Sequence, residues 1–342
     1  MNKLTKIGAS ALCGSLAVVA SANAGEMTVK GGATATWSSN EGTTTGNPIG
    51  LSSGITFTGT GELDNGTTFT LSLTNTDQSA YSAGQIALTT PSLGTFTIDQ
   101  SGGGIDRIDD MMPTAWEETT GTSLGTGIQT INGVGSGTSV EWNIAADMLP
   151  DGLAAQVAWT PRASGNKAND KASTGDGGNG LGSGYDIVLT HTGLQDGLTV
   201  FGGYSVIEQA AFHDGDRTQK GLGATYAMGG LTVGYEWTVD NRQIVGATSH
   251  ATGGLTSMYE NNMYGVSFSV NDDLAISYGV LKSDRSLTDG TSVEAEAESL
   301  QLSYSMGGAS LKIAETSVDD ASYVSGTAND NDGTTIALTL AF

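Results

Sequence analysis

The residue types that build catalytic and zinc sites are few and scattered in this sequence. The three histidines, His191, His213 and His250, lie in different segments. None of them has a serine, a cysteine or a second histidine at the spacing that nucleophilic or zinc chemistry requires. We therefore predict that the chain is not an enzyme.

Carboxylates, by contrast, are concentrated in one polar segment, residues 101–137. Five acidic side chains and one basic side chain give this segment a formal charge of −4. They are Asp106, Arg107, Asp109, Asp110, Glu117 and Glu118. Carboxylates held together in a confined space raise the local cation concentration and oppose anions. The alternative is that they lie on a solvated external loop and only keep the protein soluble.

Smaller clusters of acidic and amide side chains occur in several other polar stretches. Examples are Asp214-Gly215-Asp216, Asp272-Asp273, Asp319-Asp320 and Asn329 to Asp332. Oxygen-rich loops of this kind can bind calcium, but none of these has the spacing of a recognised calcium loop. We expect no cofactor and a solvated acidic rim, with calcium as the alternative.

The first 24 residues have the features of a secretory signal peptide. Lys3 and Lys6 precede an apolar run over residues 7–20, which is followed by small residues ending at Ala24. This pattern predicts export and cleavage after Ala24. The only cysteine, Cys13, lies in this segment without a lipoprotein cleavage box. The mature chain is therefore expected to have no thiol, disulfide or lipid anchor.

The expected mature chain, residues 25–342, is strongly acidic and rich in glycine. It keeps 318 of the 342 residues, and its formal net charge changes from −23 to −25 because Lys3 and Lys6 are lost. So acidic a surface repels nucleic acid. No later stretch approaches the roughly 18 apolar residues of a membrane helix. With 51 glycines and 5 prolines in the chain, three classes fit: a membrane β-barrel, a secreted β-sandwich and a β-solenoid.

Apolar and small polar residues alternate over one predicted strand after another. Residues 27–37, 55–63 and 68–74 show this pattern, and residues 231–239 show it most clearly. A period of two residues indicates a sheet with unlike faces. The Asp64-Asn65-Gly66 turn between two such runs is a strong hairpin signal.

Short and long connections alternate along the chain. The seven short turns are at residues 64–66, 91–94, 147–152, 193–197, 228–230, 271–273 and 306–308. The eight polar loops are at residues 39–50, 78–81, 101–137, 162–183, 209–217, 241–257, 283–292 and 320–331. Fifteen connections predict sixteen strands, with turns at one end and longer loops at the other, as in outer-membrane barrels.

A closed barrel is the form in which such a sheet can cross a membrane. Lipid offers no hydrogen-bond partner, so the sheet must close on itself with its apolar face outward. A barrel of about 16 to 18 strands leaves an aqueous channel along its axis. We predict a sixteen-stranded antiparallel transmembrane β-barrel. By alternation Lys30 and Lys312 face its lumen, and Lys220 is a weaker candidate.

The C-terminal residues form a predicted strand with one apolar face. Ile336, Leu338, Leu340 and the terminal Phe342 share this face. A terminal phenylalanine after alternating apolar residues resembles the assembly signal of Gram-negative outer-membrane proteins. The alternative is an ordinary edge strand, although proteins normally avoid exposed apolar edges. The mature chain as a whole resembles the general bacterial porin family, and within it the alphaproteobacterial branch.

This resemblance implies a location, a set of partners and an assembly. It implies the Gram-negative outer membrane, contact with outer-membrane lipid and lipopolysaccharide, and insertion by the outer-membrane barrel assembly machinery. It also implies a homotrimer. The very short second loop, residues 78–81, departs from relatives that use a longer loop to latch onto a neighbouring subunit.

The resemblance further implies a pore geometry. In the family the third loop, here residues 101–137, folds into the barrel and narrows the pore, which would place the six charged residues named above at the constriction. We predict weak cation preference from their charge. Family porins oppose such acids with a basic cluster on the facing wall. This sequence lacks that cluster, and Lys30 is the best candidate for a counter-charge.

Aromatic residues recur near the ends of the apolar faces. They are Trp37, Tyr226, Trp237, Tyr264, Tyr278, Tyr304 and Phe342. Membrane barrels place such girdles at both interfaces, whereas scattered core aromatics are the alternative. Glu315 is discordant, because alternation puts it on the face of Leu311 and Ile313. A bulge, a subunit interface or a position above the lipid band would each explain it.

These features predict a passive outer-membrane diffusion channel for small hydrophilic solutes and ions. A substrate-specific channel would have an aromatic or basic track along its lumen, whereas the predicted lumen residues are mostly Thr, Ser and Gly. A secreted solenoid or surface adhesin would have repeats of fixed period, and we find none.

Overall fold

The computed structural model describes residues 25–41, 46–77, 83–99, 103–121, 124–135, 138–163, 181–209, 215–243 and 255–341. The predicted signal peptide, the second loop at residues 78–81, His213, His250 and the terminal Phe342 lie outside these residues. In the part of the chain that is described, no helix is long and apolar enough to cross a membrane.

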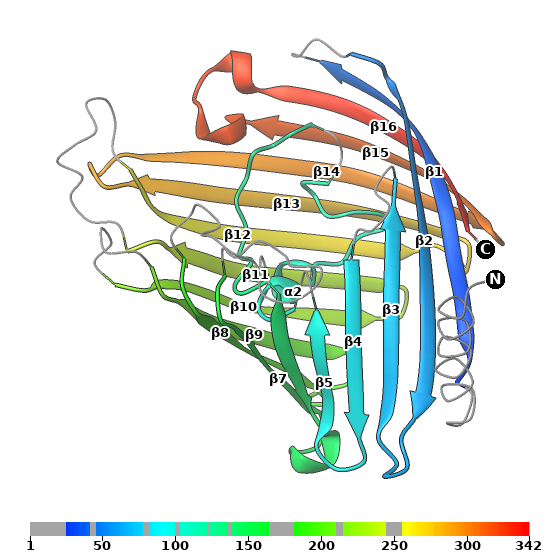
Figure 1. Cartoon of the computed structure of the whole chain (residues 1–342). Coiled ribbons are helices and arrows are strands. Elements are labelled where there is room, and N and C mark those ends of the chain that lie inside the picture. Colours follow the sequence, from blue (N-terminus) through cyan, green and yellow to red (C-terminus); the bar gives the residue numbers. More distant parts are fainter. Residues whose placement is uncertain are drawn as a thin grey trace, which may run out of the picture.

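Sixteen strands within the described residues form one closed antiparallel barrel, which confirms the predicted fold (Figure 1). Each strand pairs with its neighbours in sequence, and β1 pairs with β16 to close the ring, with Gly32 opposite Ala341. The strands are β1 (Met27–Glu41), β2 (Ile49–Glu62), β3 (Thr68–Thr76), β4 (Ala83–Thr90), β5 (Gly94–Asp99), β6 (Ser139–Ile144), β7 (Leu153–Thr160), β8 (Gly184–Thr192), β9 (Leu198–Ile207), β10 (Arg217–Met228), β11 (Leu231–Asn241), β12 (Thr256–Ser269), β13 (Leu274–Leu287), β14 (Ser292–Met306), β15 (Ala309–Asp319) and β16 (Asn331–Ala341).

The two faces of the barrel follow the predicted alternation. Outward positions carry exposed apolar and aromatic side chains, including Trp37, Tyr264 and Leu300. Inward positions carry mostly small and polar residues, with larger apolar side chains such as Val188 and Phe201 on part of the wall. Hydroxyls pair across neighbouring strands on the inner face, as between Thr34 and Thr339 at 3.0 Å and between Thr56 and Thr74 at 3.0 Å. The apolar face is thus turned outward and the polar face inward.

Alternation places Lys30 and Lys312 on the inner face, as predicted, but the prediction for Lys220 is wrong. On β10 the inward positions are held by buried Gln219 and Gly221, so Lys220 projects outward beside exposed Leu222. Its ammonium lies 5.8 Å from the centre of the Tyr204 ring. The sequence misled here because the outer face of β10 includes a lysine and the small Ala224, while the inner face carries Gly221 and Gly223, so its period is hard to read.

The seventh external loop is also shorter than predicted. The sequence suggested a loop over residues 283–292, but β13 continues to Leu287 and β14 begins at Ser292. The Leu287 N–H donates to the Thr291 carbonyl at 2.9 Å across a tight turn, with Gly290 at φ +87°. The sequence misled here because residues 282–286 of β13 are all polar, so the alternation that marks a strand disappears there, while β14 turns its small apolar residues Ala295 and Ala297 inward.

Glu315 lies on the outer face of β15, exposed to the surroundings of the barrel. Its pairing with Thr334 continues the regular register between β15 and β16, which excludes a bulge. The Thr334 hydroxyl donates to the Glu315 carboxylate at 2.9 Å. This hydrogen bond supplies a partner to a charge at the point where the outer face of β15 changes from apolar Leu311 and Ile313 to polar Ser317 and Asp319.

Candidate functional site

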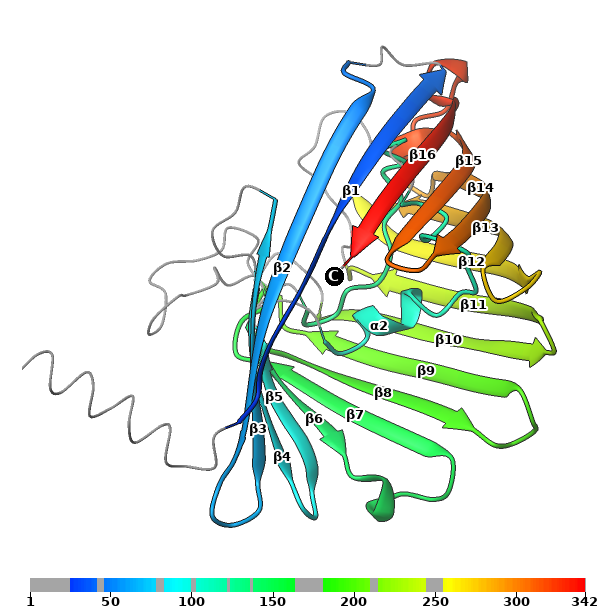
Figure 2. The same cartoon turned by 90° about the vertical axis from the view of Figure 1, so that its right-hand side faces the viewer.

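The connection between β5 and β6, residues 100–138 and called loop 3 below, turns into the barrel. Figure 2 shows its short helix α2 (Asp106–Asp109) inside the ring of strands. The inward turn is held by two acids on the wall. The Gly104 N–H donates to the Glu141 carboxylate at 3.0 Å, and the Ile105 N–H donates to Asp186 at 2.9 Å. The predicted inward fold of the third loop is confirmed.

An apolar contact fixes the first half of loop 3 to the wall. Ile105, Ile108 and Ile131 form a buried cluster with Val188 of β8 and Phe201 of β9. Beneath them the wall is made of glycine. A Cβ at Gly203 would lie 2.6 Å from Ile108, and a Cβ at Gly221 would lie 2.9 Å from the same side chain. Glycine at these inward positions therefore lets loop 3 lie flat against the strands.

Polar side chains of the wall bind the backbone of loop 3. Gln219 of β10 accepts a hydrogen bond from the Asn132 N–H at 3.1 Å. Gln301 of β14 accepts from the N–H groups of Trp116 and Glu117, both at 3.1 Å, and donates to the Glu117 carbonyl at 2.8 Å. Buried peptide groups need such partners, and this irregular segment takes them from the wall.

All six charged residues predicted for the constriction lie on loop 3 inside the barrel, but the wall changes their balance. Arg107 forms an ion pair with Glu141, and its Nε donates to the Gly104 carbonyl at 3.2 Å. The single base of the loop is thus neutralised by an acid that sequence analysis did not single out. The sequence gives little indication that Glu141 pairs with Arg107, because the two residues are far apart in the chain and belong to different elements.

Lys312 meets loop 3 at a different point. Its ammonium lies 5.8 Å from the centre of the Trp116 ring. It also interacts with Glu117, whose pKa is raised by burial against the opposing pull of the Lys312 charge. Lys30, on β1, lines a hollow of about 550 Å³ on the inner face at β16, β1 and β2. The structure therefore brings Lys312 to the loop acids but leaves Lys30 on the hydroxyl-lined wall.

A fourth carboxylate joins Asp109, Asp110 and Glu118. Glu236 of β11 faces inward, is fully buried, and neither of its carboxylate oxygens has a hydrogen-bond partner among the described residues. Its register neighbours on the wall are Gly223 and Met263. The alternation of residues 231–239 predicts that Glu236 faces inward, but sequence analysis gave it no role.

Burial, together with nearby carboxylates at some positions, raises the pKa values of Asp106, Asp109, Glu117 and Glu118. Burial raises the pKa of Asp109 to about 7, and burial with the nearby charges of Asp110 and Asp186 raises the pKa of Asp106 to about 6. The pKa of Glu118 is raised by its hydrogen bond to Asp110, by burial and by the neighbouring carboxylates. At neutral pH some of these groups are protonated, so the loop carries less negative charge than the formal count of −4.

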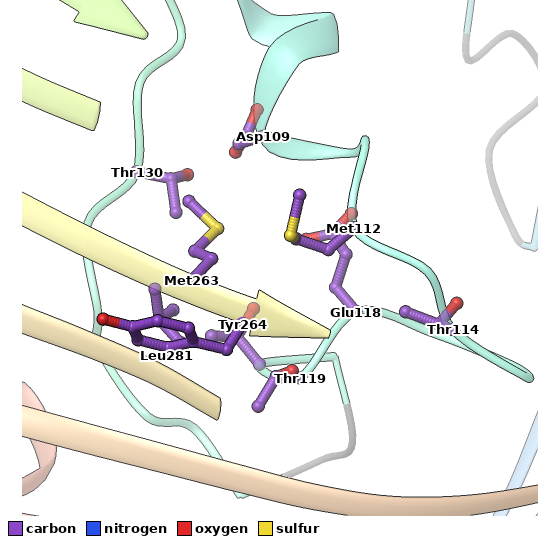
Figure 3. A pocket seen from close by; sticks show the side chains of 10 residues that line it. Asp109, Met112, Thr114, Glu118, Thr119, Thr130, Met263, Tyr264 and Leu281 are labelled. Carbon is purple, nitrogen blue, oxygen red and sulfur yellow. The ribbon is translucent and has the colours of Figure 1, made fainter. Parts of the chain in front are cut away.

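A small cavity lies between this part of loop 3 and the wall. Figure 3 shows the thioethers of Met112 and Met263 near Asp109, with Glu118 close by. The cavity of about 20 Å³ has room for about one water molecule. No group of three or more histidine, cysteine or acidic side chains in the described part of the chain is arranged to hold a metal ion. The expectation that no cofactor binds, with calcium as the alternative, stays a prediction.

Comparison with known protein families identifies the class of this barrel. A model of the Gram-negative porin family matches residues 8–342. The chain belongs to the Gram-negative porin family. Membership makes it a channel protein of the outer membrane. No curated protein sequence matches this porin.

Solved porin structures share the fold of this porin at low sequence identity. OmpF of Salmonella typhi, in complex with daunomycin, is 16% identical, with 93% of this chain and 98% of that chain covered and a TM-score of 0.67. The trimer form of OmpT from Vibrio cholerae is 11% identical, with 94% and 100% covered and a TM-score of 0.66. An anion-selective porin from Comamonas acidovorans is 15% identical, with 93% and 100% covered and a TM-score of 0.61.

The C-terminal residues occupy the positions expected of them in β16. Ile336, Leu338 and Leu340 face outward and are exposed. Leu338 pairs with Ala35 of β1 and with Leu311 of β15, so the predicted assembly signal lies on a strand that closes the barrel. The role of this strand, together with Phe342, in assembly stays a prediction.

The hydrogen bonds of Gln301 generate a test of loop 3 anchoring. Gln301→Leu removes the acceptor for the N–H groups of Trp116 and Glu117, so we expect their hydrogen exchange to accelerate about tenfold or more. Hydrogen–deuterium exchange with mass spectrometry measures the exchange rate of these two N–H groups. Gln85→Leu is the control, because Gln85 bonds to Asp99 and not to residues 116–117. Equal exchange in Gln301→Leu and the native porin would show that Gln301 is not an anchor.

Proposed function

We propose that this porin is a passive diffusion channel for small hydrophilic solutes and ions with a weak preference for cations. The observation that carries the proposal is the gathering of Asp109, Asp110, Glu118 and Glu236 at one place inside the barrel. Arg107, the base of the same loop, is held by Glu141. Acidic side chains in a confined aqueous path favour cations. Burial and shared protons reduce their charge, so the preference is weak.

The wall at β1 to β5 supports passage of uncharged polar solutes. Between residues 25 and 99 the sequence has one basic residue, Lys30. The inner face there consists mainly of threonine, serine and glycine, and its hydroxyls already pair with one another, as Thr89 does with Thr95 at 2.8 Å. Among the described residues of β1 to β5 no dense row of positive charge faces loop 3, so the transverse field of the family pattern is weak here. The lumen therefore favours small hydrophilic solutes without demanding one chemical group.

The similarity to an anion-selective porin does not transfer its selectivity to this chain. At 15% identity that likeness reports the fold, while selectivity depends on particular side chains. In a pore of this kind the side chains that matter for selectivity are the charged ones of loop 3 and the wall. For this chain those charges are the acids described above.

We also propose that the porin is exported through a signal peptide, residues 1–24, which is cleaved, and that it assembles as a homotrimer. The outer faces of β1, β2 and β4 carry small residues that would allow close approach of another subunit. They are Gly31, Ala33, Ala35, Ser53, Gly59 and Gly84. The trimer form of the OmpT relative supports this arrangement. Contact with lipopolysaccharide and insertion by the barrel assembly machinery follow from the same proposal.

Single-channel recording across a salt gradient tests the pore and its selectivity. The native porin is expected to conduct, with a reversal potential of cationic sign. Replacing both Asp109 and Asp110 with Asn removes two carboxyl groups from loop 3 and should lower the cation-to-anion permeability ratio. One charge at about 10 Å in water is worth about 0.4 kcal/mol, or a factor of about 2 in local cation concentration. We therefore expect at least about a twofold fall.

The matched control is Asp272→Asn with Asp273→Asn, which removes two charges from the turn between β12 and β13. It should leave the reversal potential unchanged. Absence of conductance would refute the pore. An anionic reversal potential, or equal shifts in the two double variants, would refute the assignment of selectivity to loop 3.

The raised pKa values predict that selectivity depends on pH. Asp106 and Asp109, with pKa values of about 6 and about 7, lose their protons as the pH rises through that range. The negative charge of loop 3 therefore grows between about pH 5 and about pH 9, and the cation preference should increase. Reversal potentials recorded over this pH range measure the change in cation preference. The Asp109→Asn, Asp110→Asn variant should show a smaller change, and an equal change would assign the titration to other groups.

The proposed trimer can be tested on the outer face. Ala33→Phe places a bulky ring on the outer face of β1 and should convert trimers to monomers in mild detergent. Ala224→Phe places the same ring on the outer face of β10, away from the proposed interface, and should leave trimers intact. Native mass spectrometry gives the subunit number. A native monomer, or the same response in both variants, would contradict the interface.

A further inference from the structure

We propose that the connection between β15 and β16 clamps loop 3 in place, and that Tyr323 is the positioning residue of this clamp. The segment it holds is the return limb of loop 3, residues 124–129. This inference rests on the proposed function, because it concerns how the width of a conducting pore is maintained. It adds a contact between two loops to the wall contacts already described.

Hydrogen bonds join the two loops directly. The short helix η2 (Ala321–Tyr323) follows β15. The hydroxyl of buried Tyr323 accepts from the Gln129 N–H at 3.0 Å and bonds with the Ser283 hydroxyl of β13 at 2.7 Å. The Ser322 N–H donates to the Thr126 carbonyl at 2.7 Å. The backbone of the return limb is therefore tied to η2 at two points.

Apolar packing places the return limb between η2 and the wall. Leu124 packs in a buried cluster with Ala297, Val318 and Ala321. Ile128 contacts that cluster and a second one, in which Tyr259 and Ala295 pack with Tyr323. The rings of Tyr259 and Tyr323 lie 5.2 Å apart, and the Arg285 guanidinium lies 6.0 Å from the Tyr323 ring. One face of the limb thus meets the wall strands and the other meets η2.

The backbone of the clamp has a conformation that needs support from its contacts. Ser322 and Tyr323 have φ values of +59° and +61°, in the left-handed region that side chains with a Cβ disfavour. Such conformations persist where the surrounding contacts over-determine them. On loop 3, Gly127 has φ +68°, and a Cβ there would lie 2.2 Å from the Ser322 hydroxyl. The two loops fit closely at this point.

The clamp holds a part of loop 3 that the hydrogen bonds from Gln301 and Gln219 do not reach. Gln301 holds residues 116–117, and Gln219 holds Asn132. Between them the return limb has one hydrogen bond from the wall, from the Asn261 amide to the Gln129 carbonyl at 3.1 Å. Without the Tyr323 hydroxyl the limb would be held by that bond, the Ser322 N–H and apolar packing, so it would leave the wall and enter the lumen more often. Tyr323 therefore keeps the limb out of the conducting path.

The experiment compares the two tyrosines of the Tyr259–Tyr323 ring contact. Tyr323→Phe removes the acceptor for the Gln129 N–H, and the population of displaced limb should rise about tenfold, because a buried N–H is left without a partner. We expect about tenfold faster hydrogen exchange at Gln129 and a matching increase in open-channel current fluctuations. Tyr259→Phe removes the other hydroxyl of the pair, which takes no part in these hydrogen bonds, and should behave as the native porin.

A pair of glycine variants tests the same contact from loop 3. Gly127→Ala forces a Cβ against Ser322 and should reproduce the effects of Tyr323→Phe. Gly125→Ala is the control, since Gly125 has a similar φ of +61° but no atom within 4 Å of the added Cβ. Backbone strain is common to both variants, whereas the collision with η2 is specific to Gly127.

A cysteine pair makes the clamp reversible. Gly127→Cys with Ser322→Cys places two Cβ atoms near disulfide distance, because the built Cβ of residue 127 lies 3.0 Å from the Ser322 Cβ. Oxidation should suppress the current fluctuations and slow the exchange at Gln129, and reduction should restore both.

The outcomes separate the clamp from the pore. A native porin without conductance would refute the proposed function, while hydrogen exchange at Gln129 would still decide about the clamp. Native exchange and native current fluctuations in Tyr323→Phe would overturn the clamp in a conducting porin. Equal effects of Tyr323→Phe and Tyr259→Phe would overturn the role of the Tyr323 hydroxyl.

Discussion

A peptide group inside a membrane finds a hydrogen-bond partner only in the protein itself, and the rest of this structure depends on that constraint. The pairing of β1 with β16 meets it by leaving no strand edge unpaired. Closure then fixes two surfaces, an apolar one toward lipid and a polar one around water. The inner surface is wide enough to admit a folded loop, so the chain can set the pore with a segment separate from the barrel.

Loop 3 is subject to the same requirement on a smaller scale. It has little regular structure, so the wall must supply partners for its backbone, and Asp186, Gln219 and Gln301 do so. Glycines such as Gly203 and Gly221 make room for its apolar side chains. These inward residues are spread over strands β8 to β14. The inner face of the wall therefore both holds loop 3 and lines the water-filled channel.

The sequence predicts the elements of this porin better than the contacts among them. The two-residue period and the turn at residues 64–66 are local signals, so strands and their number could be predicted from them. The Arg107–Glu141 pair and the Tyr323–Gln129 hydrogen bond join residues that are 34 and 194 positions apart. Alternation tells which way a side chain faces, as for Glu236, but not what it meets across the lumen.

This difference bears on selectivity, because a field depends on distances and protonation as well as on the number of charges. Arg107 is cancelled by the wall, and the pKa of Asp109 is raised because it is buried among other carboxyls. Both effects exist only while loop 3 lies against the wall between β6 and β14. If the return limb left the wall, water would reach these carboxyls, their pKa values would fall toward ordinary values, and their charge would grow. The contacts that fix the width of the pore therefore also fix its charge, so width and selectivity change together.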